Sequence, residues 1–581
     1  MINRTTRNRG ARRILFIGAL SIVMILTSKA APNNTASVQI KVVSVGVTQA
    51  QLDAVDKILP QSPALAALLR SANYRHLYTE AIEPENRPAP SATASRFRAV
   101  FYDYGQRRTI VAEGSLGQPE AVVARVEPNG ETAVDDAEFQ DAVGVLMSDP
   151  RFGPALLSRD VTAYRPMPPV QGLNANGSRL TDRIVNVGLL PKPGSENFHH
   201  EIVGVNLGTN SIVRYPGRAP RQTGTINDAT CGAHPAGQST TRRGTAGQYQ
   251  LTVTDTDGTV LWDMLVLRPS ISSGTNASGI ELRDVKYKGH SVLKRAHVPI
   301  LNVQYLDGVC GPYRDWLYQE GMFQASGTDI VGAPGFRDCG TTPATTELET
   351  GTDVGNFRGV ALYREGNEVV LVTELEAGWY RYVNEWRFDF DGTIRPRFGF
   401  GATANSCTCF SHTHHAYFRF DFDIDGTNNS IYELPLGASV DRSDSRIATE
   451  KKIFRAGNPP QSYRIRGGKR SYLLYPGAND GAADAYAQGD MWFLHWHDGP
   501  TNLLAEIDDG HGFFDPTEAD LDQFLTNEPL LKQDSVIWYH ASFLHTPDNE
   551  ADGVREGETK PGVQILSGPE VVGPDLVPDG F

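Results

Sequence analysis

The chain has 581 residues, enough at roughly 150 residues per domain for about four domains, or three with one large. Hydrophobic residues make up 40% and charged residues 21%, and 57 Gly with 36 Pro favour many turns over long helices. These values exclude coiled-coil, collagen-like and wholly disordered chains. The 54 Lys and Arg against 68 Asp and Glu give a net charge of -14, so the surface repels phosphate backbones and we expect no nucleic-acid partner.

Residues 1–30 are typical of a signal peptide. Five arginines precede an apolar run from Ile14 to Thr27, and the small residues Ser28 and Ala30 suit cleavage after Ala30. The run is about 14 residues long, against the roughly 20 that span a bilayer, so we favour a cleaved signal over an uncleaved anchor. We therefore expect a secreted or periplasmic protein with no stable membrane insertion after cleavage.

Five cysteines cannot form a disulfide framework in so long a chain, and the odd number leaves at least one thiol unpaired or intermolecular. Export permits disulfides, and we expect Cys310 to pair with Cys339. Cys407 and Cys409 lie close to His412, and the alternative for them is binding of a soft metal ion.

Two small α+β domains are expected in the first part of the chain. Strand and helix patterns predict one domain over residues 38–117, and a similar pattern predicts a second over 118–225. In the second, residues 121–126 are expected as a strand and 135–146 as a helix. A stretch rich in Gly, Thr, Pro and Arg, at about 220–247, indicates a linker.

Helical periodicity nearly disappears after the linker. Short runs of alternating apolar and polar residues, as at 378–388, 416–424 and 535–543, predict a large all-β sandwich over 240–581. Asp391-Gly392 is typical of a hairpin turn between two of its strands. The expected fold class is therefore α+β amino-terminal domains followed by a large all-β sandwich.

The segment that begins at His412 carries the most informative pattern. Alternate residues of a strand share a face, so His412 and His414 lie with Phe418, Phe420 and Phe422, while Tyr417, Arg419, Asp421 and Asp423 face the other way. Neutral imidazoles in a dry environment bind copper or zinc. A single His-x-His is also common in ordinary strands, which is the alternative on this feature alone. We interpret His415 as a surface or internally hydrogen-bonded histidine.

Together with two other strands, this segment resembles the copper amine oxidases, which use topaquinone (TPQ) made from one of their own tyrosines. In that family a His-x-His strand runs into Arg-x-Asp-x-Asp-x-Asp-Gly, as residues 412–426 do. Downstream, Asp534 and the Trp538-Tyr539 strand precede His545-Thr546-Pro547, the family's context for a third copper ligand. Upstream, Trp386-x-Phe388 and the turn Asp391-Gly392-Thr393-Ile394 match the end of the strand that holds the quinone precursor.

The resemblance implies the site residues. The copper ligands would be His412, His414 and His545, and the register of the upstream strand places the topaquinone precursor at Tyr380. The stretch from Glu281 to Gly308 is similar to the family segment that delivers the catalytic base, which assigns that role to Asp307.

The activity implied is oxidoreductase chemistry: oxidative deamination of a primary amine by O2 to an aldehyde, ammonia and hydrogen peroxide. The resemblance also implies a homodimer. It further implies a peripheral calcium site on the second face of the same strand, made by the carboxylates of Asp421, Asp423 and Asp534 and the carbonyls of Phe422 and Ser535. The alternative for these carboxylates is a solvated acidic face.

Three positions depart from the family pattern. Trp379 and Arg381 flank Tyr380 where the family has Asn and an acidic residue, and Ile300 stands where a gating tyrosine usually follows Val-Pro. Trp379 and Arg381 support an alternative function: an exported copper-binding homologue that forms no quinone and acts as a binding or interaction module. Ile300 supports a third: an oxidase that acts on a bulky amine, because loss of the gating tyrosine widens the entrance.

Overall fold

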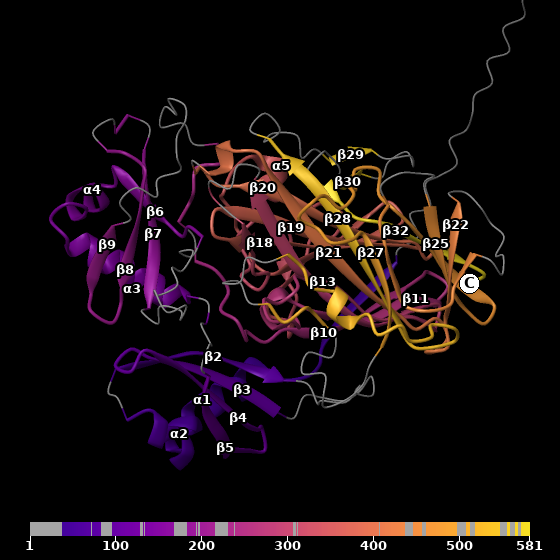
Figure 1. Cartoon of the computed structure of the whole chain (residues 1–581), viewed down its shortest axis with the longest axis horizontal. Coiled ribbons are helices and arrows are strands. Elements are labelled where there is room, and N and C mark those ends of the chain that lie inside the picture. Colours follow the sequence, from indigo (N-terminus) through magenta and orange to yellow (C-terminus); the bar gives the residue numbers. More distant parts are fainter. Residues whose placement is uncertain are drawn as a thin grey trace, which may run out of the picture. The chain divides into compact units, whose positions relative to one another are not determined.

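Two large β-sheets contain most of the strands in the computed structural model, and two smaller α+β units and one separate hairpin contain the others (Figure 1). The structure describes residues 38–70, 73–82, 96–127, 132, 134–167, 183–192, 194–195, 198–214, 231–237, 239–305, 310, 312–405, 407–435, 445–455, 461–496, 507–511, 518–546, 555–557, 564–566 and 571–581. The predicted signal peptide, residues 1–30, lies outside these ranges. Within them, no helix is long and apolar enough to cross a membrane.

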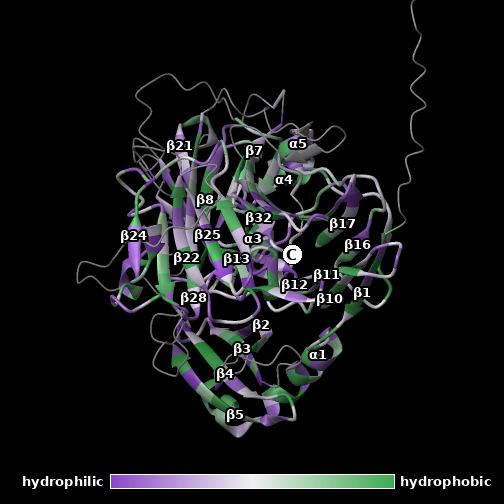
Figure 2. Cartoon of the chain, turned by 90° about the vertical axis from the view of Figure 1, so that its right-hand side faces the viewer, coloured by the Kyte–Doolittle hydropathy of each residue, from purple (hydrophilic) through white to green (hydrophobic). Residues whose placement is uncertain are grey.

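The first α+β unit is a four-stranded antiparallel sheet with two helices. Its elements are α1 (Gln49–Ile58), α2 (Pro63–Leu68), β2 (Tyr74–Ile82), β3 (Arg96–Asp103), β4 (Arg108–Ser115) and β5 (Gln118–Glu127). Thr48 begins α1 with a capping box, in which its hydroxyl accepts from the Gln51 N–H and the Gln51 side chain accepts in return. Leu52 and Val55 of α1 are buried, and Val55 belongs to one buried cluster with Phe97, Ile110 and Val122 of the strands. Figure 2 shows hydrophobic residues recurring along these strands.

One boundary of this unit differs from our expectation. The strand predicted at 121–126 belongs to β5 and pairs with β4, so it completes the first sheet and does not begin the second unit. A tight turn is the reason, because Ser115 and Gln118 are paired across the end of the β4–β5 hairpin.

The second unit has the same composition of elements. It contains α3 (Asp136–Ser148), α4 (Gly153–Ser158), β6 (Val161–Tyr164), β7 (Ile184–Pro191), β8 (Glu201–Asn206) and β9 (Ser211–Arg214). Asp135 begins α3 with a second capping box, with Glu138 as its partner. Glu138 is fully buried and is compensated by the Arg183 guanidinium, which donates to its Oε1 at 2.8 Å.

The two large sheets are mostly antiparallel. The ten-stranded sheet contains β1 (Gln39–Ser44), β10 (Gln248–Thr254), β11 (Val260–Leu267), β12 (Glu281–Tyr287), β13 (His290–Tyr305), β21 (His412–Phe422), β28 (Ser535–His545), β27 (Met491–His495) and β24 (Lys451–Ile453), with β14 (Tyr313–Arg314) beside β13. The twelve-stranded sheet contains β15 (Thr328–Asp329), β16 (Phe336–Asp338), β17 (Val360–Glu365), β18 (Glu368–Ala377), β19 (Tyr380–Asp389), β20 (Ile394–Ala402), β32 (Asp575–Asp579), β26 (Arg470–Tyr475), β25 (Gln461–Gly467), β22 (Ser430–Pro435) and β23 (Arg446–Ile447), with β31 (Val571–Val572) beside β20. The remaining elements are the short helix α5 (Glu347–Thr350), the hairpin of β29 (Arg555–Gly557) and β30 (Gln564–Leu566), and short 3-10 turns.

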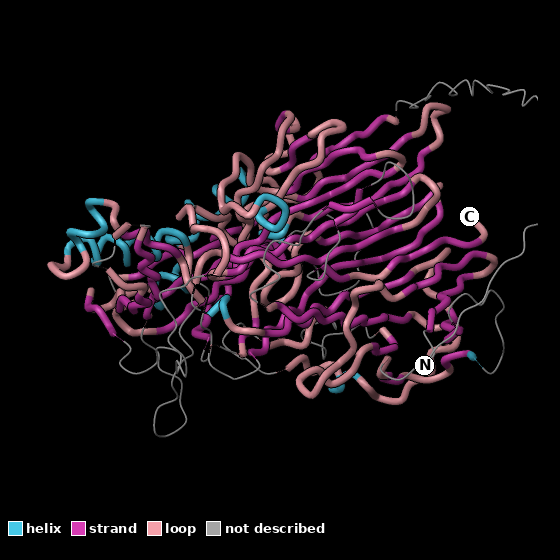
Figure 3. Tube along the Cα trace, turned by 90° about the horizontal axis from the view of Figure 1, so that it is seen from above, coloured by secondary structure: helices cyan, strands magenta, loops and turns pink. Residues whose placement is uncertain are grey.

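Long neighbouring strands dominate these sheets (Figure 3). Phe418 and Phe420 of β21 belong to the same buried hydrophobic cluster as Tyr382 and Trp386 of β19, so the two sheets pack face to face. The predicted all-β sandwich is confirmed. The hairpin turn predicted at Asp391-Gly392 is also confirmed, since it joins β19 to β20.

The first described strand also differs from our expectation. β1 lies at the edge of the ten-stranded sheet, where Gln39 to Ser44 pair with β10. The sequence predicted these residues as part of the first α+β domain. Backbone pairing with β10 satisfies the hydrogen-bonding groups on one edge of β1.

The cysteines pair differently from our expectation. Cys231 bonds to Cys409 and Cys310 bonds to Cys407, while Cys339 is a buried free thiol. The predicted Cys310–Cys339 pair is therefore wrong, because the chain brings Cys310 to a partner 97 residues away. Soft-metal binding by Cys407 and Cys409 is excluded while both sulfurs are in disulfides. Two disulfides are typical of proteins from oxidising compartments.

Candidate metal centre and redox site

The pairing of β21 with β28 brings three imidazoles together. His412 lies directly opposite His545, and His414 follows two residues along β21 on the same face. The ring centroid of His412 is 4.8 Å from that of His414 and 4.6 Å from that of His545. All three side chains are fully buried.

Hydrogen bonds fix the tautomer of each ring. His412 Nδ1 lies 2.7 Å from the Phe410 carbonyl oxygen, and His545 Nε2 lies 3.2 Å from that of Thr408. A carbonyl only accepts, so these nitrogens carry the protons, and the lone pairs lie on His412 Nε2 and His545 Nδ1. His414 Nδ1 lies 3.1 Å from the Tyr382 hydroxyl, which donates its own proton elsewhere, so His414 also keeps its lone pair on Nε2.

These imidazoles are suited to a metal ion. Burial, together with the neighbouring His545 ring, lowers the pKa of His412 to about 3. Burial and the same imidazoles lower the pKa of His414 well below its usual range. Among the described residues, His412 Nε2 and His414 Nε2 have no hydrogen-bond partner. Buried lone pairs without a donor are costly, and a copper or zinc ion bound by imidazole nitrogens would satisfy them.

Tyr380, at the start of β19, lies beside this cluster. Its ring centroid is 5.2 Å from that of His414 and 5.7 Å from that of His412. Burial raises the pKa of its phenol well above the usual range, and the neighbouring Tyr305 phenol and Asp315 carboxylate raise it further. The phenol is therefore protonated.

Tyr305 is a residue of the site to which the sequence analysis gave no role. It pairs with His412 across β13 and β21 and stacks on that ring at 4.6 Å between centroids. Its hydroxyl lies 2.5 Å from the Tyr380 hydroxyl. A direct hydrogen bond between two buried phenols fixes the orientation of the Tyr380 ring. The sequence clue was its place immediately before Leu306-Asp307-Gly308.

Asp315, just after β14, is a second residue to which the sequence analysis gave no role. The Tyr382 hydroxyl donates to its Oδ2, while its Oδ1 has no partner among the described residues. Burial raises its pKa to about 8, against the smaller opposing effects of the Tyr382 hydrogen bond and the Arg314 charge. A buried carboxylate beside aromatic residues is a common feature of sites that move protons. Asp307, the base expected from the sequence, lies outside the described residues.

The three departures from the family pattern have structural explanations. Arg381 faces away from the imidazoles, and its guanidinium donates to Asp353 at 2.7 Å, so its charge is compensated. Trp379 packs edge-on against Tyr380 at 5.9 Å between ring centroids. Ile300 pairs with Tyr417 and packs on the β21 face opposite the imidazoles. Ile300 therefore does not occupy a gating position beside Tyr380.

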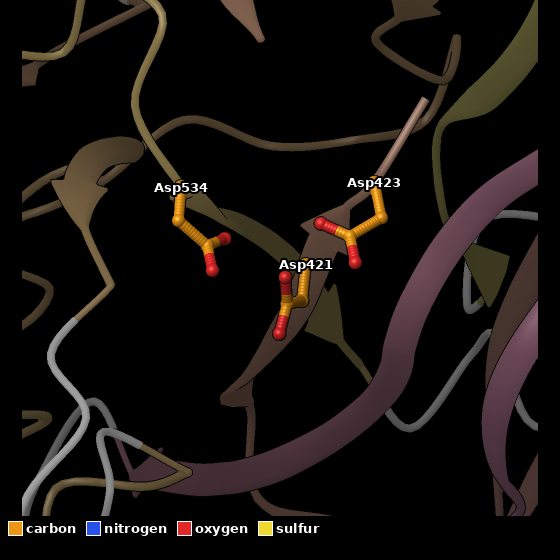
Figure 4. Close-up of side chains that lie close together, drawn as sticks. All are labelled: Asp421, Asp423 and Asp534. Atoms are coloured by element: carbon orange, nitrogen blue, oxygen red, sulfur yellow. The ribbon is translucent and has the colours of Figure 1, made fainter. Parts of the chain in front are cut away.

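The acidic group predicted from the sequence lies at the other end of β21. Oxygen atoms of Asp421, Asp423 and Asp534 lie within 4.8 Å of one another, and Figure 4 shows the three carboxylates directed toward a shared space. Phe422 and Ser535 are paired across β21 and β28 beside them. Three carboxylates this close repel one another unless a cation lies between them.

Comparison with known proteins identifies the fold. No family model and no curated protein matches the sequence. A copper-containing benzylamine oxidase from Hansenula polymorpha superimposes with a TM-score of 0.55 at 14% identity, over 92% of this chain and 97% of that one. An amine oxidase from Aspergillus nidulans gives a TM-score of 0.50 at 13% identity, over 92% and 88%.

The chain has the fold of these amine oxidases. At such low identities the likeness shows the fold alone, and it confirms the predicted fold class. What the site does is argued from its own residues.

The two disulfides generate the first prediction. They hold the turn Cys407–Cys409, which supplies the Thr408 carbonyl to His545 and leads into the Phe410 carbonyl that orients His412. Cys407→Ser should therefore weaken copper binding about 10- to 100-fold, the usual cost of losing support for a ligand. Competition with a chelator measures the copper dissociation constant.

Cys339→Ser is the matched control, since it replaces a buried cysteine that is in no disulfide. It should bind copper as the unmodified chain does. Far-UV circular dichroism checks that both variants fold. Equal copper affinity of folded Cys407→Ser and Cys339→Ser would contradict the role of the turn.

Proposed function

We propose that the chain is an exported copper amine oxidase, with copper held by His412, His414 and His545 and topaquinone formed from Tyr380. In this proposal it converts a primary amine and O2 to an aldehyde, ammonia and hydrogen peroxide. The observation that carries the proposal is the buried Tyr380 phenol beside three neutral imidazoles whose lone pairs are set by hydrogen bonds. The shared fold supports it.

The imidazole set suits copper by its chemistry. When bound, copper with three imidazole ligands offers positions to water and O2, and a quinone offers a carbonyl electrophilic toward primary amines. The chain's own residues orient the groups of the site and exclude water from it. Tyr305 holds the phenol oxygen of residue 380, Tyr382 links His414 to Asp315, and the aromatic residues around them exclude water.

We propose Asp315 as the base that takes the α-proton of the bound amine. Its Oδ2 is held by Tyr382 while its buried Oδ1 is available to accept, and a carboxyl with a pKa of about 8 is a stronger base than an exposed one. Asp307 is the alternative carried over from the sequence.

The remaining parts of the proposal are the location and the assembly of the protein. We infer export from the arginine-rich, apolar first 30 residues and the two disulfides. We infer a homodimer from the resemblance alone, and light scattering of the mature chain tests it, a monomer at micromolar concentration being the contrary result. The second candidate function, a copper-binding module without quinone, is favoured by Trp379, which packs against Tyr380 where the family has a small amide.

Quinone formation distinguishes the two functions. Protein given Cu(II) and O2 should develop a visible absorption and react with phenylhydrazine. Tyr380→Phe should bind copper equally well but stay colourless and unreactive, because it lacks the phenol oxygen. Tyr472→Phe is the matched control and should still colour, because it removes a buried phenol hydroxyl that donates to the Gly392 carbonyl and not to the imidazoles. Copper binding without colour in the unmodified chain would favour the binding module.

Asp315→Asn tests the base. If Asp315 takes the α-proton, kcat/KM should rise with pH as its carboxyl ionises near pH 8, because a base acts only when deprotonated. Asp315→Asn should form the quinone, lose about 100- to 10,000-fold in kcat and show no rise near pH 8. Asp307→Asn is measured in parallel. Loss of turnover in Asp307→Asn but not in Asp315→Asn would return the role to Asp307.

We also propose calcium binding by Asp421, Asp423 and Asp534, with the carbonyls of Phe422 and Ser535. Calcium at 100 times its dissociation constant should stabilise the fold by about 2.7 kcal/mol, because it binds the native state. Thermal unfolding with and without Ca2+ measures this stabilisation. Asp534→Asn should abolish it and the exposed Asp329→Asn should not, and an equal calcium response in both would contradict the site.

A further inference from the structure

A second pair of imidazoles lies on the opposite face of β21 and β28. His415 Nδ1 is 3.0 Å from His540 Nε2, and the rings stack at 5.3 Å between centroids with an interplanar angle of 19°. His540 Nδ1 is in turn 3.3 Å from Asp490 Oδ1. Both histidines and Asp490 are fully buried. This arrangement is separate from the three-imidazole cluster, because adjacent strand residues point to opposite faces.

The hydrogen bonds determine where the protons lie. Asp490 also lies 3.6 Å from the Arg455 guanidinium, so its charge is already compensated and a cationic His540 would add an uncompensated buried charge. Neutral His540 donates its Nδ1 proton to Asp490, so its Nε2 accepts from His415 Nδ1. The lone pair of His415 therefore lies on Nε2. This nitrogen is buried and has no hydrogen-bond partner among the described residues.

The group that faces this lone pair is the Asp484 carboxylate. The backbone N–H groups of Tyr486 and Ala487 donate to Asp484 Oδ1 at 2.8 and 3.1 Å, which orients the side chain. Its Oδ2 lies 3.7 Å from His415 Nε2, beyond hydrogen-bond distance. Two electron-rich atoms, His415 Nε2 and Asp484 Oδ2, therefore face each other. The hydrogen bonds of His415 Nδ1 and of Asp484 Oδ1 hold the two side chains in this orientation.

The distance between these atoms suits a metal ion. Zinc lies about 2.0–2.1 Å from an imidazole nitrogen and about 2.0–2.2 Å from a carboxylate oxygen, so one ion can join atoms up to about 4.3 Å apart. The 3.7 Å separation is within that reach without movement of either side chain. A metal-binding histidine usually donates its second ring N–H to a hydrogen-bond acceptor, often a carboxylate, that holds the ring in place. Here His415 donates to His540, and His540 donates to the Asp490 carboxylate.

We propose that His415 Nε2 and Asp484 Oδ2 bind a divalent ion of the zinc class, with His540 and Asp490 as positioning residues. Asp484 is 40% exposed, so the ion reaches the site from solvent, and water completes its coordination. The ion would link the segment before β27 to the strand that carries His412 and His414. This site is independent of the proposed copper chemistry.

The test is a titration of Zn2+ into the full chain carrying His412→Ala and His545→Ala, which removes the three-imidazole cluster. We expect one zinc ion per chain. Adding Asp484→Asn should weaken binding at least tenfold, and His540→Phe should weaken it about 10- to 100-fold through loss of positioning. Asp257→Asn is the matched control, since Asp257 also accepts a backbone N–H in an exposed turn but faces no histidine, and it should bind zinc unchanged.

Zinc-edge X-ray absorption identifies the ligands. One imidazole with oxygen ligands is expected, and this spectrum should be lost in Asp484→Asn, whose loop position leaves the strands intact. Absence of bound zinc in the double-alanine chain would overturn the proposal. Equal zinc affinity of Asp484→Asn and Asp257→Asn, or a spectrum with several imidazoles, would overturn it too.

Discussion

The antiparallel register of β21 and β28 is the constraint on which every candidate site depends. It places His412 opposite His545 at one end and Phe422 opposite Ser535 at the other. On the second face it sets Tyr417 opposite His540, which brings His540 diagonally to His415. A slip of one residue would turn each side chain to the other face of the sheet, and the three-imidazole cluster, the acidic group and the His415 pair would all be lost.

The sandwich buries β21 on both faces, so the polar side chains of this strand lose contact with water. All residues of β21 are buried, although His412, His414, His415, Arg419 and Asp421 are polar. Each buried imidazole is held by a backbone carbonyl, a hydroxyl or another imidazole, which offsets part of the desolvation cost. Such a network is sensitive to the loss of single partners. The turn held by the two disulfides therefore affects the imidazole cluster, although its cysteines are not proposed as ligands.

Strand periodicity made much of the site predictable. The alternation in residues 412–424 correctly separated the imidazole face from the Asp421 face, and the alternation in residues 378–388 correctly predicted the strand that contains Tyr380. The role of Tyr380 itself was assigned from the family resemblance. Local patterns carry this information because a strand repeats every two residues. The same patterns predicted a two-layer β fold, which the structure confirms.

Features that depend on long-range packing were not predictable. The disulfide partners of Cys310 and Cys231 lie 97 and 178 residues away, and nothing local distinguishes them from Cys339. Asp315 follows a two-residue strand, too short to show a pattern, and only its burial reveals its raised pKa. The assignment of β5 to the first sheet likewise depends on its pairing with β4, which the local sequence pattern does not show.

The central claim is that three imidazoles from two paired strands bind copper beside Tyr380. Anomalous diffraction at the copper edge from copper-loaded crystals tests it most directly, because it locates the metal without reference to activity. The account predicts a strong peak bounded by His412 Nε2, His414 Nε2 and His545 Nδ1. Copper located elsewhere, with no peak among these three rings, would contradict it.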